Sequence, residues 1–242
     1  MERTQTRPVT PRNAVVWAAL RAELDRGTSL TVLDVGGGTG GFAVPLAEAG
    51  HRVTVVDASP DALAALTRRA AEAGVAERIT GIQGDGDRLA ELVPPGSADL
   101  ILCHSLLEVV DDPAEVVAAL AGTLRPGGAA SIIVANRAAA VLSRAMAGHL
   151  GAAVAALTDP DGRAGAADKL RRRFDADGAA ALLRAAGLTV EAIHGVRVLA
   201  DLLPGAVADA DPEALLAFEL AAADRPPYRD IATQLHLYAR KQ

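Results

Sequence analysis

Cysteine, aromatic residues and long apolar runs are scarce in this sequence. Cys103 is the one cysteine among 242 residues, which excludes an intramolecular disulfide. It lies in an apolar stretch, so we interpret it as a packing residue rather than as a reactive thiol. One tryptophan, two tyrosines and three phenylalanines supply all the aromatic rings. A protein that stacks an extruded nucleobase usually offers more of them.

The sequence also lacks the patterns of membrane insertion and export. There is no run of about eighteen apolar residues and no basic-plus-apolar leader. We therefore expect a cytoplasmic protein with no membrane partner. The formal net charge of −6 disfavours a broad nucleic-acid-binding surface, although a local basic patch can oppose the overall sign.

The stretch from Leu30 to Asp57 organises the chain. Leu30 to Val35 has the length and valine content of a buried parallel strand. The glycines that follow allow a sharp turn and a close approach of the backbone to a ligand, at the start of a helix; they are Gly36, Gly38 and Gly40. A second strand, Arg52 to Val56, ends on Asp57, where a carboxylate is placed to bind a ribose. This βαβ unit predicts a nucleoside site.

The glycines alone leave two kinds of nucleoside cofactor open. Gly36, Gly38 and Gly41 also satisfy the G-x-G-x-x-G pattern of proteins that bind a nicotinamide or flavin dinucleotide. Asp34 favours the other kind, because a carboxylate there suits a cofactor with an ammonium and a sulfonium better than a pyrophosphate. The pattern D-x-G-x-G-x-G, followed by an acidic strand end, resembles the class I S-adenosylmethionine-dependent methyltransferases. The resemblance implies S-adenosylmethionine as cofactor.

Strands and helices alternate along the first half of the chain. The predicted elements are a helix from Arg12 to Arg26 ended by Gly27, a helix from the Ser59 cap to Ala73, strands Arg78–Ile82, Ser97–Cys103 and Ala129–Ala135, and a helix begun by Asp112 and Pro113. We therefore expect a doubly wound, Rossmann-like α/β fold. Two later strands bring the expected number to seven, and the resemblance implies a mostly parallel sheet with an antiparallel last strand and accessory helices.

The second half departs from this alternation. We predict a helix from Ala138 to Ala156, a flexible loop from Thr158 to Asp168, a basic run from Lys169 to Arg173, a helix from Phe174 to Ala186, a strand from Leu188 to Val198, a helix from Pro212 to Ala223 and a strand from Ile231 to Ala239. The basic run is interpreted as a solvated face, with phosphate contact as the alternative. The resemblance implies that residues 1–242 form one methyltransferase domain, and we expect 12–135 to bind the cofactor and 136–242 to supply the substrate side.

Scattered segments narrow the resemblance to one branch. They are P-R-N-A-V-V-W at residues 11–17, L-I-L-C-H-S-L-L-E-V-V-D-D-P at 100–113, L-R-P-G-G, Asn136, G-V-R-V at 195–198 and Q-L-H-L-Y-A-R-K near the end. Together they resemble the tRNA wobble-uridine 5-carboxymethoxy methyltransferases, which esterify a carboxylate. Val109 stands where that family tends to have tryptophan, and Leu235 where tyrosine precedes the histidine. The acceptor is therefore tRNA or a small carboxylate or hydroxylated metabolite, and a non-catalytic cofactor-binding protein stays open.

The resemblance also implies roles for individual residues. Arg12 would hold the methionine carboxylate, unless it is a solvated residue at a helix start. Asp34 would hold the glycine loop and the ammonium, Asp57 and Ala58 the ribose, and Asp85 and Gly86 the adenine. His104 is either a wall of the methionine pocket or a general base.

Three residues are candidates for positioning the acceptor: Asn136, Arg197 and His236. Arg197 could instead pair with a structural carboxylate such as Asp201, and His236 could be a core histidine. A carboxylate acceptor is already ionised at neutral pH, so its methylation needs no general base. No metal site is expected.

Overall fold

The computed structural model describes residues 10–26 and 29–242. The sequence from Arg3 to Pro11 also predicts a mobile arm, and most of it lies outside these residues, as does the predicted helix stop at Gly27. Seven strands form one sheet with the order β3-β2-β1-β4-β5-β7-β6. The strands are β1 (Thr31–Val35), β2 (Arg52–Asp57), β3 (Ile79–Gln83), β4 (Ala98–His104), β5 (Leu124–Ala135), β6 (Leu188–Val196) and β7 (Gln234–Lys241).

The first five strands are parallel, and β7 runs antiparallel to both of its neighbours, β5 and β6. The predicted fold class is therefore confirmed, including the antiparallel last strand. Because the sheet is continuous from β3 to β6, the second half of the chain completes the sheet that the first half begins. The division of roles at residue 135 stays a prediction.

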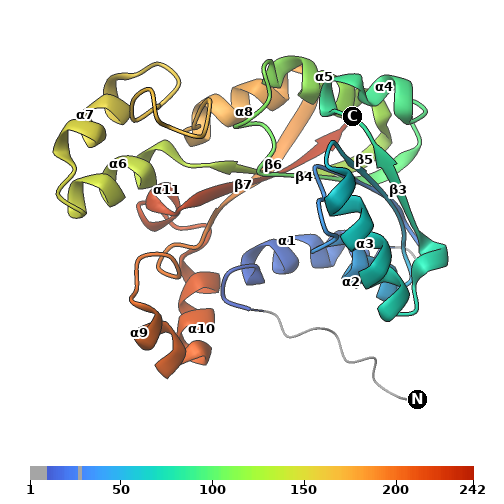
Figure 1. The fold of residues 1–242 in the computed structure, drawn as a ribbon, viewed down its shortest axis with the longest axis horizontal. Helices are drawn as coiled ribbons and strands as arrows, with labels where there is room; N and C mark the ends of the chain where they lie inside the picture. The colour runs from blue at the N-terminus through green and yellow to red at the C-terminus, as the bar shows by residue number, and fades with distance from the viewer. Residues whose placement is uncertain (1–9, 27–28) are drawn as a thin grey trace.

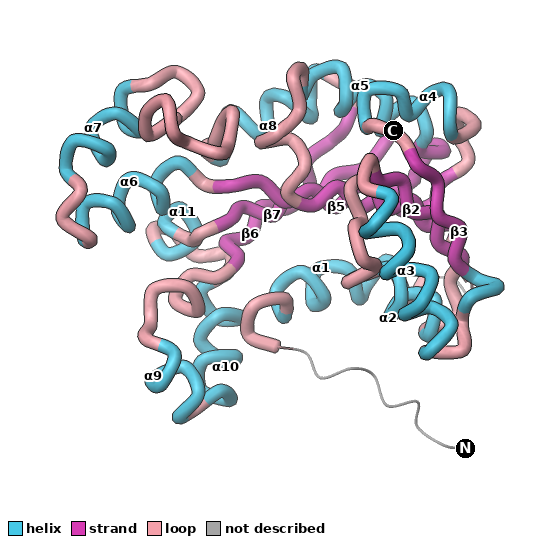
Figure 2. Tube along the Cα trace, in the orientation of Figure 1, coloured by secondary structure: helices cyan, strands magenta, loops and turns pink. Residues whose placement is uncertain are grey.

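The helices cover both faces of the sheet and extend beyond one edge of it (Figures 1 and 2). They are α1 (Ala14–Leu24), α2 (Ala43–Glu48), α3 (Pro60–Glu72), α4 (Leu89–Leu92), α5 (Pro113–Thr123), α6 (Arg137–Met146), α7 (Leu150–Thr158), α8 (Ala176–Ala185), α9 (Gly205–Ala210), α10 (Pro212–Ala222) and α11 (Tyr228–Ile231). Among the described residues, no helix is long and apolar enough to span a bilayer.

The predicted helix caps are present at α3 and α5. The Ser59 hydroxyl accepts a hydrogen bond from the backbone N–H of Ala62, at 3.2 Å, and Pro60 occupies the first helical position. Asp112 accepts from the N–H groups of Ala114 and Glu115 in the same way, ahead of Pro113. These local signals place both helices directly after a segment that leaves the carboxyl edge of the sheet.

Two apolar layers enclose the sheet. One layer packs α5 and α8 against side chains such as Leu33, Ile101 and Ile132. The other packs α1, α2 and α3 against the opposite face, through side chains such as Val32, Leu102 and Ile133. Leu102, Ile101 and Ile132 are fully buried, so the central strands have no wet face, as is typical of a parallel sheet.

The helix predicted from Ala138 to Ala156 is wrong in one respect. Gly148 has a positive φ of 79° and ends α6, and α7 begins two residues later. The result is a pair of helices that lies beyond the carboxyl edge of the sheet, at the left of Figure 1. The strand predicted up to Val198 ends earlier, at Val196, because Arg197 adopts a positive φ of 60°.

Candidate cofactor and acceptor site

The glycine loop between β1 and α2 has the conformation that its sequence predicts. Gly36, Gly38 and Gly40 have positive φ values of 73°, 56° and 79°, a region that side chains with a Cβ rarely adopt. Gly41 is not among the positive-φ residues, and a Cβ added to it would meet nothing within 4 Å. The conformationally required glycines are therefore those of G-x-G-x-G, and G-x-G-x-x-G is a coincidence of spacing.

Asp34 lies beneath this loop, near the end of β1. Its side chain is 3 % exposed, and a Cβ on Gly37 would come within 2.5 Å of its carboxyl carbon. Burial, and secondarily the charge of Asp57, raises the pKa of Asp34 to about 7. The described structure gives its carboxylate no hydrogen-bond donor. A buried carboxylate of this kind is stabilised when a cation binds beside it.

Asp57 joins the glycine loop to the next helix. One carboxylate oxygen accepts a hydrogen bond from the Gly38 N–H at 2.8 Å, and the other accepts from the Ser59 N–H at 2.9 Å. Each carboxylate oxygen can accept a further bond, so the carboxylate fixes the loop and can still bind a diol.

A cleft of about 450 Å³ opens at the carboxyl ends of β1, β2 and β3. It contains five of the predicted cofactor residues: Gly36, Asp57, Ala58, Asp85 and Gly86. Its opposite wall comes from the segment after β4 and from the start of α5: Leu106, Val109, Val110, Asp111, Asp112, Glu115 and Val116. The wall combines apolar side chains, which suit a flat ring, with carboxylates, which suit hydroxyl, amino and cationic groups.

Arg12 and Arg197 lie outside this cleft and share one carboxylate. The Arg12 guanidinium is 3.0 Å from Asp201, and the Arg197 guanidinium is 3.6 Å from the other oxygen of Asp201. The predicted structural partner of Arg197 is thus present. The Nε atom of Arg197 is buried and has no partner among the described residues, so part of its donor set is still available.

Asn136 makes structural contacts, and its role with the acceptor stays a prediction. Its side-chain oxygen accepts from the Ala138 N–H, which caps α6, and its amide donates to the carbonyls of Asp230 and Ala232. Its side chain is 3 % exposed, and these bonds use both of its donor hydrogens. Asn136 therefore fastens the start of α6 to the segment that precedes β7.

His104 and His236 belong to one buried chain of polar side chains. The Ser131 hydroxyl lies 2.9 Å from Nε2 of His104 and 2.9 Å from Nε2 of His236. The His236 Nδ1 atom lies 3.1 Å from Nδ1 of His194. His236 is fully buried, so the core-histidine alternative describes it and direct contact with an acceptor does not.

Comparisons with known proteins agree with this geometry. A methyltransferase-domain family matches residues 32–128. The tRNA 5-carboxymethoxyuridine methyltransferase of Escherichia coli K12 is 32 % identical over 234 residues, which cover 95 % of this chain and 88 % of that protein. The chain belongs to the S-adenosylmethionine-dependent methyltransferases.

Two further proteins place this methyltransferase among its relatives. The ubiquinone biosynthesis O-methyltransferase of Xylella fastidiosa strain 9a5c is 36 % identical over 166 residues, 69 % of this chain and 63 % of that protein. The solved structure of an S-adenosylmethionine-dependent methyltransferase from Mesorhizobium loti matches with a TM-score of 0.64 at 23 % identity, over 96 % of this chain and all of that one. The described fold is that of the family.

The residues present fit S-adenosylmethionine, the cofactor of this methyltransferase. The buried Asp34 carboxylate lacks a cationic partner, the loop needs glycine where Cβ atoms would collide, and the cleft reaches from β1 to β3. The alternative of a dinucleotide oxidoreductase is wrong, because its glycine pattern depends on Gly41 and the chain belongs to another family.

The cleft wall after β4 contains residues that sequence reasoning missed. Val109, Asp111 and Glu115 line the cleft, although in the sequence the segment at 100–113 indicated only a family resemblance. The signal that could have found them is their position, because a segment that leaves the carboxyl end of a central strand borders the ligand crevice. Val109 is 44 % exposed, so the position where the family tends to have tryptophan faces the cleft.

Glu108, in the same segment, was also missed. One of its carboxylate oxygens accepts from the Ala135 N–H at 3.1 Å, and the other is buried without a partner among the described residues. Burial raises the pKa of Glu108. Its backbone carbonyl accepts from the N–H groups of Arg171 and Arg172, so this residue links β5 to the basic run.

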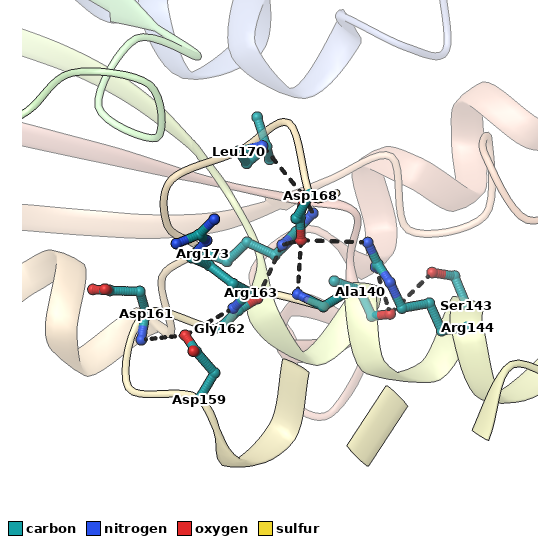
Figure 3. Close-up of polar contacts among 11 residues, drawn as sticks. Ala140, Ser143, Arg144, Asp159, Asp161, Gly162, Arg163, Asp168, Leu170 and Arg173 are labelled. Atoms are coloured by element: carbon teal, nitrogen blue, oxygen red, sulfur yellow. Dashed lines mark hydrogen bonds and ion pairs between the residues drawn. The ribbon is translucent and has the colours of Figure 1, made fainter. Parts of the chain in front are cut away.

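The interpretation of the basic run, Lys169 to Arg173, as a solvated face is wrong for Arg172 and Arg173, which are half-buried and buried. Its alternative, phosphate contact, stays a prediction. Arg171 pairs with Asp111, and Arg172 donates to the carbonyls of Leu107, Val110 and Asp111. Arg173 is buried and donates to both oxygens of Asp168 (Figure 3). Arg171 and Arg172 therefore fasten the run to the segment after β4, and Arg173 fastens it to the loop that precedes it.

The loop predicted to be flexible, Thr158 to Asp168, is held by its own aspartates. Asp159 accepts from the N–H groups of Asp161 and Arg163, and Asp168 accepts from those of Ala164 and Leu170 (Figure 3). Arg144 of α6 lies 3.7 Å from the same Asp168. These contacts join the loop to the α6–α7 pair.

Proposed function

We propose that this methyltransferase esterifies the carboxylate of 5-carboxymethoxyuridine in tRNA. The observation that carries the proposal is the extent of the likeness to the Escherichia coli enzyme, 95 % of this chain and 88 % of that protein. The likeness continues past residue 128, where the general methyltransferase match ends, into the helices beyond the carboxyl edge. The Xylella O-methyltransferase match spans a smaller share of both chains.

The chemistry of the site supports an acceptor that is already ionised. When bound, S-adenosylmethionine supplies an electrophilic methyl group on a positively charged sulfur. His104 is a poor base, because burial lowers its pKa to about 3. A base this weak would not remove the proton of an ordinary hydroxyl at neutral pH, whereas a carboxylate has none to remove. The chain then needs to orient the acceptor and exclude water.

Arg197 is the side chain proposed to orient the acceptor carboxylate. It follows β6 at the carboxyl edge, it adopts a strained backbone conformation, and its buried Nε lacks a partner. A planar guanidinium can hold a carboxylate through two parallel hydrogen bonds. Asp201 occupies part of this donor set, so an acceptor carboxylate would replace or join it.

Labelled cofactor and two forms of one tRNA would test this proposal. The purified protein is incubated with tRNA that carries 5-carboxymethoxyuridine, and with the same tRNA that has unmodified uridine at this position. We expect label only in the first, in a form that mild alkali releases, as a methyl ester requires. Label in neither tRNA, with S-adenosylhomocysteine still bound, would contradict the tRNA assignment.

A matched pair of arginine variants tests the role of Arg197. Arg197→Lys keeps the charge and loses the planar fork, so we expect a higher KM for the acceptor with unchanged affinity for S-adenosylhomocysteine. Arg184→Lys, on the exposed side of α8, is the control and should change neither. A fall in Tm with weaker binding of both ligands would instead mean that Arg197 has only a structural role.

A small carboxylic acid is the second candidate acceptor. The exposed Val109 offers no ring for stacking a base, and the formal net charge of −6 disfavours a polyanion such as tRNA. Free carboxylic acids in the same assay distinguish this candidate. Their methylation, with no label in either tRNA, would favour it.

A further inference from the structure

The hydrogen-bonded series of His104, Ser131, His236 and His194, called the polar chain below, crosses four neighbouring strands. His104 ends β4, Ser131 lies in β5, His236 in β7 and His194 in β6. Ser131 is in register with Leu102, and His236 with both Ile133 and His194. Leu102 and Ile133 belong to the layer beneath α1, so all four polar side chains lie on that face. Asp34, in register with Leu102, lies on it too.

The donor in each hydrogen bond of the polar chain determines the donor in the next. The Ser131 hydroxyl has one hydrogen, so it donates to one of the two Nε2 atoms and accepts from the other. Neutral His236 has one N–H and one lone pair, and both of its nitrogens are in the chain. Burial lowers the pKa of His104, His236 and His194, so all three are neutral at pH 7. The hydrogens therefore point along the chain in one direction or in the other.

The two ends of the chain favour one direction. Nδ1 of His104 is buried and has no partner among the described residues. His194 is half-buried, and the charge of the exposed Asp224 acts on it in favour of a proton while that of Arg229 opposes it. Hydrogens that point toward His194 place its outer N–H where water and Asp224 are near. Hydrogens that point the other way leave an N–H of His104 buried and unpaired, which is the more costly arrangement.

We propose that Ser131, His236 and His194 are positioning residues that hold His104 with its hydrogen on Nε2 and the lone pair of Nδ1 free for the ammonium group of the cofactor. His104 lies beside the glycine loop, since its ring contacts that of Phe42 with centroids 4.7 Å apart. Its Nε2 faces β5, so the other ring nitrogen lies toward β1. If Asp85, two residues after β3, binds the adenine and Asp57 at the end of β2 binds the ribose, the methionine end reaches β1 and β4. The ammonium is the donor group at that end.

This inference concerns the cofactor and does not depend on the identity of the acceptor. Its first test is spectroscopic and uses the full chain with ¹⁵N-labelled histidine. Long-range ¹H–¹⁵N correlation should show His104 protonated on Nε2, and Nδ1 should shift when S-adenosylhomocysteine is added. Protonation of His104 on Nδ1 in the free chain would overturn the proposal.

The second test compares two ligands in binding calorimetry. Ser131→Ala should weaken S-adenosylhomocysteine binding by about tenfold, as for one lost hydrogen bond. It should leave the affinity for an analogue that lacks the amino group unchanged. Ser131→Thr, which keeps the hydroxyl, should restore most of the affinity. Equal losses for both ligands, or no loss for either, would overturn the proposal.

A variant at His194, the outer end of the polar chain, tests the proposal without relying on the Ser131 variants to fold. His194→Phe keeps a ring against His236, with which it stacks at a centroid distance of 5.3 Å, but removes the last acceptor of the chain. It should lower the Nε2–H population of His104 and weaken binding of the amino-bearing ligand alone. His149→Phe, at an exposed histidine outside the chain, is the control. An unchanged His104 spectrum in His194→Phe would show that the chain does not set its protonation.

Discussion

At the scale of single residues, Asp34 couples cofactor binding to pH. Its pKa of about 7 in the folded chain belongs to the unliganded state, and a bound ammonium favours the ionised form. Below pH 7, binding must therefore release a proton. We expect the affinity for S-adenosylhomocysteine to fall by up to about tenfold per pH unit below this value. Calorimetry between pH 5.5 and 8.5 measures it, with Asp61→Asn as a control.

Asp34→Asn should remove this pH dependence of the affinity and weaken binding at every pH.

The ionisation of Asp34 affects the stability of the unliganded chain in the opposite direction, because low pH favours the folded state. Its folded pKa of about 7 exceeds the ordinary aspartate pKa of 3.8, so the folded state holds an extra proton between these values. The contribution of Asp34 to the free energy of unfolding is fully present below pH 4 and is lost as the pH rises to about 7. An affinity for S-adenosylhomocysteine that does not change with pH in the unmodified chain would contradict the pKa of about 7, on which the expectations for binding and for stability both rest.

Residue roles could be predicted from the sequence only where local geometry determines them. Gly36, Gly38 and Asp57 follow strands at a fixed edge of the sheet, and their placement comes with the βαβ unit. The role of Asn136 depends on the carbonyl of Ala232, which is distant in sequence. The partner that Arg12 shares with Arg197 comes from a loop beyond β6. Spacing along the chain contains no information about such contacts.

At the scale of elements, the break between α6 and α7 depends on one glycine. Gly148 has a φ of 79° and open space around its missing Cβ, whereas Gly151 lies inside α7 with equally open space. Gly148→Ala should therefore lower the free energy of unfolding by about 1–2 kcal/mol, through backbone strain alone. Gly151→Ala should raise it by up to ~1 kcal/mol. Urea denaturation of the two variants measures both, and changes of the same sign would contradict this explanation.

Element types were easier to predict than element ends. The caps at Ser59 and Asp112 gave correct starts for α3 and α5, because a cap is a contact within one turn. The helix across Gly148 was predicted as continuous, because alanine-rich flanks conceal a single residue with positive φ. The basic run was misinterpreted for a similar reason. The sequence displays the charges of Arg171 and Arg173, but the fold supplies Asp111 and Asp168 beside them.

At the scale of the whole molecule, one sheet joins the two halves of the chain, and the division of their roles stays a prediction. The carboxyl edges of β1, β2 and β3 hold the cleft, and the helices that follow β5 extend the same edge outward (Figure 1). General methyltransferase signals therefore predicted the cofactor half well. The accessory half follows no general pattern, and the likeness to one enzyme is what guides the proposed acceptor.

The position of β7 has a consequence for synthesis of the protein. In the described sheet β6 is bonded to β7 alone, and β7 separates it from β5. As the ribosome releases the chain from its N-terminus, β6 therefore emerges without a strand to pair with, and it stays an open edge until residues 234–241 follow. A nascent chain arrested with β6 outside and β7 still inside the exit tunnel should be cut by protease near β6. One arrested after β7 has also emerged should resist cleavage there.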